Sequence, residues 1–458
     1  MSSRSTRPNT SRPDRRRLTT PTARSEHGLV RAVGTLGLAA GVVNVTIGGG
    51  IFRLPREVAL ALGPAAPVAF LVCAGLMALI GLSLAQAGSR LATTGGPYAY
   101  VERAFGPFAG YLTGVMTWLI GVTAIGAIGN VFIGNLAAVL PVLATPVGRA
   151  AGMVGTFAAL ATVNVLGVRH GARLSTVTTV AKLLPLLILV VGGLIAVDPA
   201  HLAVPEAPAP SAVARTSIVL LFAFTGVEYA IVPGGELRDP ARTVPRGILL
   251  GLGGVTALYL GVQLVAQGIL GPALATSSTP LPDAAGIALG PAGRALLLAG
   301  VVVSTFGYLS GMALASPRAL YALARDGFLP RPIAAVHPRF HTPWVAVIVQ
   351  LTVCCLLALL SDFGPLALIS NVAALLAYLG CAVGAWELRR RGVQEPGTTP
   401  FAMPGGAVVP VLAVVAILAL LSSITAAEWA VLGWVTLGAT AIFIATRGAR
   451  AQKSRLSA

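Results

Sequence analysis

The sequence predicts an all-α integral membrane protein with twelve transmembrane helices, arranged as a 5+5 inverted repeat with discontinuous helices 1 and 6, plus two peripheral helices. The 458-residue chain is 55% hydrophobic and 10% charged, and its mean hydropathy is +0.84. These values exceed what the cores of a soluble chain require. Twelve apolar runs approach the length of about 20 residues that crosses a bilayer as a helix. The first and the sixth of these runs are broken by glycine.

The predicted spans follow one another with mostly short connections. They cover residues 36–55, 66–88, 108–139, 149–167, 176–197, 216–237, 247–270, 294–323, 343–361, 365–389, 407–423 and 428–446. We expect a core at 34–389, divided into halves at about 34–197 and 216–389, and a peripheral pair within 390–446. Because each half has five spans, the second half enters the membrane in the opposite orientation. Its broken helix then meets the first one near the midplane.

The positive charge of the chain follows the predicted topology. A net charge of +17 could indicate a nucleic-acid partner, but 27 of the 32 Lys and Arg residues lie in alternate segments on one predicted side. The five on the other side are Arg53, Arg56, Arg149, Arg215 and Arg294. The positive-inside rule therefore places both termini in the cytoplasm, and we expect no nucleic-acid partner. Residues 1–33 form an Arg-rich tail that cannot bury a core, so we expect it to be disordered. Residues 447–458 form the other cytoplasmic tail.

The residues that an enzyme or a metal site needs are missing from the predicted spans. The five histidines lie in the tail or the loops, and no carboxylate pair or metal-ligand cluster is present, so we expect no catalytic residue, cofactor or metal. Cys73, Cys354, Cys355 and Cys381 lie inside apolar runs and are expected to be small core residues. Ser83, Ser304 and Ser310 are lone hydroxyls, which we expect to bond to their own helices.

The glycines have two different expected roles. Gly48, Gly49 and Gly50 are consecutive, each costs a helix about 1 kcal/mol, and Pro55 follows. A merely kinked helix is the alternative. Unpaired backbone groups in a bilayer cost several kcal/mol unless they line a cavity and meet a ligand, so the break predicts a binding site. Five glycines of the third span are instead expected to allow close packing of helices. These are Gly114, Gly121, Gly126, Gly129 and Gly134.

Two ionisable side chains lie well inside the predicted spans: Lys182 and Glu228. A charge inside the membrane usually faces a polar interior and has a function. Lys182 lies about two turns into the fifth span, so it either faces a cavity or snorkels to the surface. Glu228 follows Gly226 and can accept hydrogen bonds from amides freed by the break. It is either a structural latch or a proton-carrying or gating residue, and the sequence does not separate the two.

Several segments carry a recognisable pattern. Residues 48–52 (GGGIF) lie in the first span and 222–228 (FAFTGVE) in the sixth, followed by the loop 236–246 (ELRDPARTVPR). The eighth span ends in 316–330 (SPRALYALARDGFLP), and 337–340 (HPRF) follows. In this order they resemble the signatures G-[SG]-G-[IV]-F, F-x-F-x-G-x-E and E-x-x-[ND]-P of the amino acid, polyamine and organocation (APC) transporter superfamily.

The resemblance implies a set of binding residues. A substrate α-carboxylate would be held by the amides of Gly48, Gly49 and Gly50, and freed N–H groups at a helix start also favour an anion on physical grounds. The α-ammonium would meet carbonyl groups near Thr46, Ile47, Phe222 and Thr225, with the Phe222 ring as a gate or lid. Side-chain selectivity would come from Ile120, Gly121, Ile125 and Met312. These positions are apolar or small, so a cationic side chain would lack a partner and we expect a neutral amino acid.

The implied function is secondary active transport of an amino acid by alternating access. A lysine at position 182 would stand in place of a bound sodium ion, which implies proton coupling. The expected partners are therefore a small-molecule amino acid, a proton and the lipid bilayer. Arg outnumbers Lys by 30 to 2, a usage typical of GC-rich bacterial genomes, which favours the plasma membrane, here the bacterial inner membrane. The alternatives are an amino-acid exchanger and a non-transporting amino-acid sensor. A sensor would be expected to carry a folded cytoplasmic domain, for which the sequence gives no sign.

Overall fold

The computed structural model describes residues 33–91, 95–137, 140–166, 168–232, 237–394, 399–422 and 424–446, with the backbone alone described for 168–180. These residues form helices, turns and one isolated parallel bridge between Val33 and Leu237. The predicted terminal tails lie almost wholly outside the described residues, and Glu236 of the 236–246 motif lies outside them too.

The α-helices follow the chain in this order: α1 (Thr35–Thr46), α2 (Leu54–Leu62), α3 (Ala66–Arg90), α4 (Pro97–Phe105), α5 (Pro107–Ala137), α6 (Pro146–Leu166), α7 (Val168–Gly193), α8 (Pro210–Phe224), α9 (Val227–Ala230), α10 (Pro240–Leu270), α11 (Pro280–Arg325), α12 (Trp344–Leu360), α13 (Phe363–Arg390), α14 (Val408–Leu421) and α15 (Ala426–Ala445). Short 3-10 helices connect them: η2 (Gly49–Phe52), η3 (Gly63–Ala65), η4 (Pro141–Ala144), η5 (Leu194–Ala196), η6 (Pro199–Leu202), η8 (Gly271–Ala275) and η9 (Arg331–Ala334).

The apolar helices agree in position with the predicted spans. Within the described ranges, eight helical stretches are long and apolar enough to cross a membrane. Four shorter apolar helices accompany them, at Thr35–Thr46, Ala181–Ala196, Trp344–Leu360 and Val408–Leu421. Each of the twelve predicted spans overlaps one of these stretches. The number of crossings and the inverted repeat remain predictions.

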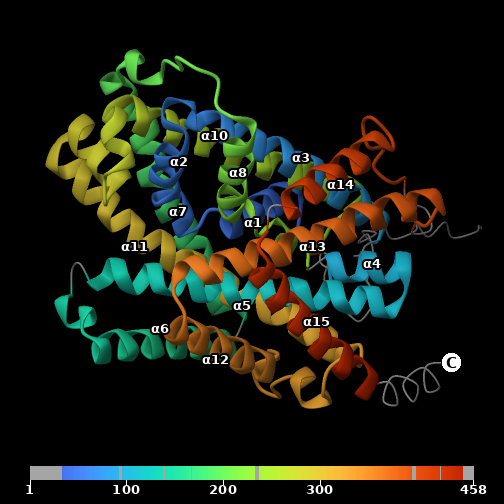
Figure 1. Ribbon diagram of the computed structural model, residues 1–458. Coiled ribbons are helices and arrows are strands. Elements are labelled where there is room, and N and C mark those ends of the chain that lie inside the picture. Colours follow the sequence, from blue (N-terminus) through green and yellow to red (C-terminus); the bar gives the residue numbers. More distant parts are fainter. Residues whose placement is uncertain are drawn as a thin grey trace, which may run out of the picture.

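The helices gather into two groups (Figure 1). In one group α10 packs against α1 and α3, and α8 packs against α3 and α2. In the other group α5 packs against α12, and α12 packs against α6. The long helices α11 and α13 contact members of both groups. The segment of the first break, η2, contacts α2 and α8 of one group and α5 of the other, and so lies between the two groups of helices.

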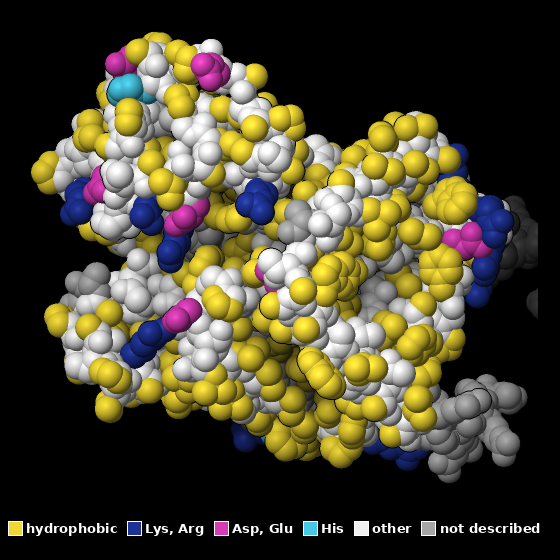
Figure 2. Space-filling model, viewed as in Figure 1, with side chains coloured by type: hydrophobic (Ala, Val, Ile, Leu, Met, Phe, Trp, Pro, Cys, Tyr) yellow, Lys and Arg dark blue, Asp and Glu magenta, His cyan; other side chains and the backbone are white. Residues whose placement is uncertain are grey.

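The molecular surface is largely apolar. Yellow hydrophobic side chains cover most of the face in Figure 2, and charged side chains gather toward the two ends of the molecule in that view. Large apolar residues are widely exposed, for example Trp434 at 75% and Leu360 at 82%. Water would penalise such a surface and lipid would not.

Three helices depart from the predicted boundaries. Residues after the first break continue as α2, which extends beyond the predicted span at 36–55, and α4 lies near residue 100, between two predicted spans. Each has a proline at its first or second position, where the missing N–H costs nothing. Helix α11 begins fourteen residues before the predicted span at 294–323, and only Gly290, with a φ of 72°, interrupts it.

The glycines of α5 mostly pack as predicted. An added Cβ at Gly114 would lie 2.6 Å from the Leu323 side chain, and at Gly129 it would lie 3.2 Å from Phe157. Gly134 is the exception. Nothing lies within 4 Å of its added Cβ, because it faces a cavity described below. The four cysteines are free thiols as expected, and three of them are buried.

Candidate functional site

The first broken helix loses its α-helical backbone at the glycine triplet. Helix α1 ends at Thr46, Ile47 and Gly48 are extended, η2 forms one tight turn, and α2 resumes at Leu54. The first amides of a helix have no acceptor within that helix. The N–H groups of residues 48–50 therefore form no hydrogen bond inside η2 or α2. No acceptor for them occurs among the described residues. The alternative of a merely kinked helix is therefore wrong.

The second break lies against the first. Helix α8 ends at Phe224, Thr225 is extended, and Gly226 has a φ of 120° before α9 begins. An added Cβ at Gly226 would lie 2.6 Å from the Val45 carbonyl oxygen and 3.4 Å from the Thr46 nitrogen. Glycine is therefore required at this position for two reasons: the positive φ, and the close approach of α1, which leaves no room for a side chain. The structure brings the two breaks into direct contact.

Side chains from other helices partner the carbonyl groups that the breaks set free. The Tyr259 hydroxyl of α10 lies 2.9 Å from the Ala223 oxygen and 3.2 Å from the Thr46 oxygen, and so bridges both breaks. The Lys182 ammonium of α7 donates to the Asn44 and Ile47 oxygens, at 2.5 Å each. Lys182 is 0% exposed, so its ammonium lies at the break and does not snorkel to the surface.

The α11 helix contributes contacts that sequence reasoning missed. Ser304 was expected to bond to its own helix, but its hydroxyl lies 3.5 Å from the Gly48 oxygen; Ser83 and Ser310 do bond to their own helices. Tyr308 and Thr305 fill the space beside Gly48 and Gly49, where an added Cβ would come within 2.7 and 2.6 Å of their side chains. A tyrosine or threonine in an apolar run gives no local signal of this role, because it depends on helix rotation.

Glu228 contacts the freed amide of the second break. Its Oε2 atom accepts hydrogen bonds from the Gly226 N–H at 3.0 Å and from the Tyr378 hydroxyl of α13 at 2.5 Å. The side chain is fully buried. The carboxyl group thus ties α9 to α13, which is the geometry expected of a structural latch.

Replacing Glu228 by glutamine separates the two roles left open for this residue. Glutamine retains an oxygen that can accept both hydrogen bonds, so we expect Glu228→Gln to keep uptake within about threefold and its pH dependence unchanged, while Glu228→Ala costs about 1–3 kcal/mol of unfolding free energy. Uptake against pH and thermal unfolding measure the two effects. A pH profile that flattens in Glu228→Gln would show that the carboxyl group carries a proton.

The predicted selectivity residues are buried in the helix packing. Ile120, Ile125 and Met312 are at most 1% exposed. An added Cβ at Gly121 would lie 2.2 Å from the Ser316 oxygen and 2.5 Å from the Tyr229 hydroxyl, so these groups occupy the space beside it. Phe222 lies near Gly50, where an added Cβ would be 3.5 Å from its ring. The structure therefore places Phe222 next to the glycine break, whereas the four predicted selectivity positions are buried in the packing between helices.

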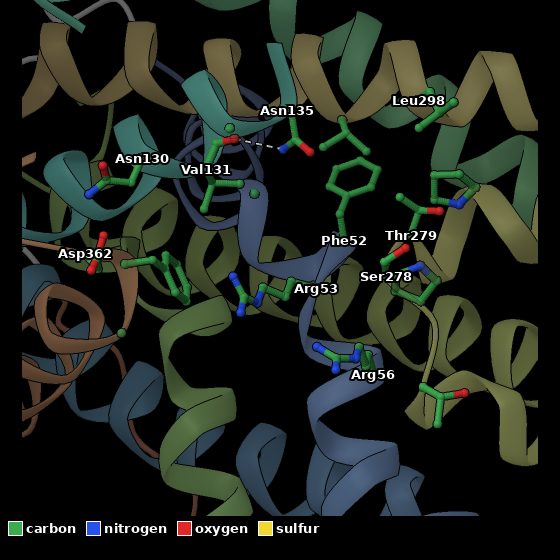
Figure 3. Close-up of a pocket in the computed structure, with 18 of the residues that line it drawn as sticks. Phe52, Arg53, Arg56, Asn130, Val131, Asn135, Ser278, Thr279, Leu298 and Asp362 are labelled. Carbon is green, nitrogen blue, oxygen red and sulfur yellow. Dashed lines mark hydrogen bonds between the residues drawn. The ribbon is translucent and has the colours of Figure 1, made fainter. Parts of the chain in front are cut away.

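A cavity of about 690 Å³ opens beside the break. Its walls come from η2, α2, α5, α6, α11 and the start of α13, and they include Gly49, Phe52, Arg53, Asn130 and Asp362. Of the predicted binding residues Gly49 alone is part of this wall. Figure 3 shows Arg53 and Arg56 directed into the space, with Asn130 and Asp362 to one side and Ser278 and Thr279 to the other.

Phe222 lies behind the cavity wall, against one of its lining residues. Its ring packs edge-on against Phe363 of α13 at 5.4 Å between ring centroids. The Arg53 guanidinium lies over the same Phe363 ring, 5.5 Å from its centroid. The aromatic pair therefore joins the α8 side of the break to α13, at a boundary between the two groups of helices.

The opposite end of the broken helices is closed by hydrogen bonds. The Gly95 N–H donates to the Val232 oxygen at 2.9 Å, and the Tyr229 hydroxyl donates to the Thr117 oxygen. The Tyr98 hydroxyl of α4 donates to Asp326 at 2.7 Å. Burial and then the Asp326 carboxylate raise the pKa of Tyr98 well above its usual value, so the phenol stays protonated and remains a donor. The break thus borders the cavity on one side, through Gly49, and these hydrogen bonds join the described residues on the other.

Comparisons with known proteins agree with these features. The model of the amino acid permease family matches residues 33–453. The serine/threonine exchanger SteT of Bacillus subtilis is 30% identical over 398 residues, which cover 85% of this chain and 90% of that protein. An uncharacterized transporter of Mycobacterium tuberculosis is 33% identical over 337 residues, covering 73% and 75%. The branched-chain amino acid permease BcaP of Bacillus subtilis is 27% identical over 442 residues, covering 90% of each chain.

The family match covers the described helices, and both broken segments lie within it. The apolar helices long enough to cross a membrane are those of a multi-pass membrane protein. This chain therefore belongs to the amino acid permeases of the APC superfamily.

Proposed function

We propose that this protein moves a neutral amino acid across the plasma membrane by alternating access, coupled to protons. One observation carries the proposal: the amides of residues 48–50 have no acceptor among the described residues, and they lie beside a second broken helix and a cavity that Gly49 lines. These N–H groups and the positive dipole end of η2 and α2 would hold a carboxylate. The amino acid, the proton and the bilayer are then the partners.

The ammonium end of the substrate would meet the carbonyl groups of the same breaks. The Ile47 and Thr46 oxygens already accept from Lys182 and Tyr259, and the Phe222 oxygen accepts from the Thr225 hydroxyl at 3.0 Å. A carbonyl oxygen has two lone pairs, so each can accept once more. In this arrangement the main chain recognises the part that all amino acids share.

A neutral side chain fits the remaining surroundings best. Ile120, Ile125 and Met312 offer no charge to pair with a cationic side chain, and an unpaired buried charge is costly. Two of the named relatives are described as acting on serine and threonine or on branched-chain amino acids, which are neutral. A basic amino acid or polyamine is therefore the less favoured substrate.

Lys182 is the proposed coupling residue. Its ammonium is buried, and among the described residues it forms no ion pair with a carboxylate. Its only described partners are two carbonyl oxygens of the α1 break. Loss or gain of a proton there would change how firmly α7 holds the end of α1. Proton transfer would thereby be linked to movement of the broken helix.

Alternating access would exchange the two closures around the break. In the structure the arginine-lined cavity is open, and the contacts of Gly95, Tyr98 and Tyr229 are made. The reverse state would open these contacts and bring Phe222 and α2 over the break. The positive-inside rule assigns the arginine-lined cavity to the outside.

Purified protein in proteoliposomes tests the proposal. A thermal-shift screen of the twenty amino acids comes first, because a ligand present at 100 times its Kd stabilises the native state by about 2.7 kcal/mol. Labelled ligand is then offered under an imposed ΔpH. Accumulation that collapses with a protonophore supports proton coupling. Absence of any amino-acid shift and any uptake would overturn the proposed function.

An amino-acid exchanger is the second candidate, since the relative SteT is named an exchanger. An exchanger would take up labelled substrate only when unlabelled amino acid is present on the far side. It would show no accumulation under ΔpH in empty liposomes. The same preparation therefore distinguishes the two functions.

A further inference from the structure

We propose that the arginine-lined cavity, called the vestibule below, is a separate carboxylate-binding subsite that captures the substrate by its carboxylate end before it reaches the glycine break. The inference rests on the proposed function, because it assumes an amino-acid substrate. It adds a ligand-binding role for three residues that the amino-acid site itself does not use. These are Arg53, Arg56 and Arg149.

The charge of the vestibule wall is predominantly positive. Three guanidinium groups and one carboxylate, Asp362, line the cavity. Glu57 lies 3.5 Å from Arg53 and 3.4 Å from Arg56, but it is not part of the wall. Two cations thus share one carboxylate that lies outside the cavity wall, and a carboxylate inside the cavity would meet a net positive field.

The arginines retain hydrogen-bond donors for a ligand. Arg149 donates to Asn130 at 2.8 Å and lies 3.4 Å from Asp362 through the same nitrogen, Nη2. Arg56 donates to the Ala275 oxygen at 3.3 Å and to Glu57 through two of its five N–H groups. A guanidinium can bind a carboxylate through two parallel hydrogen bonds. Their ion pairs are long and partly exposed, and such pairs contribute little stability, so exchange of partners is inexpensive.

The vestibule is continuous with the predicted binding site. The same wall includes Gly49 and Phe52 of η2 together with Arg53, which follows them directly. A carboxylate held at Arg53 therefore lies a few residues along the chain from the unpaired amides of the glycine triplet. In Figure 2 the surface is hollowed between the two groups of helices, and charged side chains gather along both edges. The substrate would enter with its carboxylate foremost, already oriented for the amides.

Neutralising the arginines tests the subsite. The triple variant Arg53→Gln, Arg56→Gln, Arg149→Gln is reconstituted, and initial uptake of labelled L-serine is measured at low and high ionic strength. We expect KM to rise about tenfold at low salt with kcat within twofold, because the loss concerns capture and orientation. The difference should shrink at high salt, where exposed charges are screened. Arg215→Gln, an exposed arginine of α8 outside the vestibule wall, is the matched control and should match the wild type.

A dicarboxylate without an ammonium group provides the second readout. Glutarate can pair with the guanidinium groups but cannot satisfy the carbonyl groups of the breaks. We expect it to inhibit uptake by the wild type at low salt, and to lose this effect in the triple variant. Replacing all three arginines by lysine keeps the charge but not the two-pronged geometry, and should restore part of the affinity and confirm that the protein folds.

Three results would overturn the subsite. The first is a fall in kcat with unchanged KM, which would assign the arginines to gate movement. The second is equal inhibition by glutarate in wild type and triple variant, which would place the anion at the glycine amides. The third is an equal rise in KM in Arg215→Gln, which would show that KM depends on the overall positive charge of the surface and not on the vestibule arginines. If the wild type transports no amino acid, the proposed function fails. Glutarate binding measured directly by calorimetry on wild type and triple variant then still decides whether the subsite exists.

Discussion

Uptake driven by a pH gradient is expected to disappear when Lys182 is replaced by alanine. The ammonium is the donor to the Asn44 and Ile47 oxygens. Without it, movement of a proton no longer changes the contact between α7 and the end of α1. We expect ΔpH-driven accumulation to fall to the level of liposomes without a gradient. Removing a charged donor from buried carbonyls should also cost about 2 kcal/mol of unfolding free energy.

A second substitution and a second transport assay separate coupling from folding. Lys182→Met keeps most of the apolar stem while removing the proton-binding group, so its loss of accumulation should equal that of Lys182→Ala with a smaller loss of stability. Counterflow exchange needs no net proton movement, and it should persist in both variants. Intact ΔpH-driven uptake in either variant would show that Lys182 is not the coupling residue. Loss of counterflow together with accumulation would make it a structural residue of the α1 end.

The spans were predictable because a bilayer demands long apolar runs, which are visible without knowing the fold. This requirement for long apolar runs does not reveal α2 or α4. Each has nine residues and mixes charged with apolar positions, so a search for 20-residue apolar runs passes over both. The extension of α11 back to Pro280 was not predicted, because a Gly-Pro pair such as Gly290-Pro291 is typical of a loop. In the structure the helix continues through this pair, and only Gly290 has a non-helical backbone.

Parts of the candidate site were predictable where neighbouring residues in the sequence are enough to break a helix. Three consecutive glycines interrupt a helix in any fold, and Gly226 beside Glu228 gives a similar signal in the sixth span. Tyr259 bridges both breaks, yet its sequence neighbourhood resembles any other apolar helix. Its role depends on how α10 is rotated against α1 and α8. The vestibule was hidden because it depends on the tertiary fold: Arg53 and Arg149 are 96 positions apart in the sequence, and only the folded chain places them in the wall of one cavity.

Loss of both transport and stability is expected for Gly226→Ala. The φ of 120° at this residue is a conformation that L-residues rarely adopt, which costs about 1–3 kcal/mol. The added Cβ would also lie 2.6 Å from the Val45 oxygen, and this neighbour is backbone, so α1 itself must move. The movement would shift the Gly226 amide away from Glu228 and pull the two breaks apart. We expect the unfolding midpoint to fall by several degrees and uptake to drop to background.

The control for Gly226→Ala is Gly253→Ala in α10. No atom lies within 4 Å of its added Cβ, and alanine is favoured over glycine inside a helix by about 1 kcal/mol, so this variant should be at least as stable as the wild type and transport normally. Thermal unfolding, substrate-induced thermal shift and initial uptake are measured on both. If Gly226→Ala retained substrate-induced stabilisation and wild-type uptake, close contact between the two breaks would not be needed to bind substrate. The zwitterion would then have to be held by the first break alone, since the Phe222 and Thr225 carbonyl groups assigned to its ammonium end lie across that contact from the glycine amides.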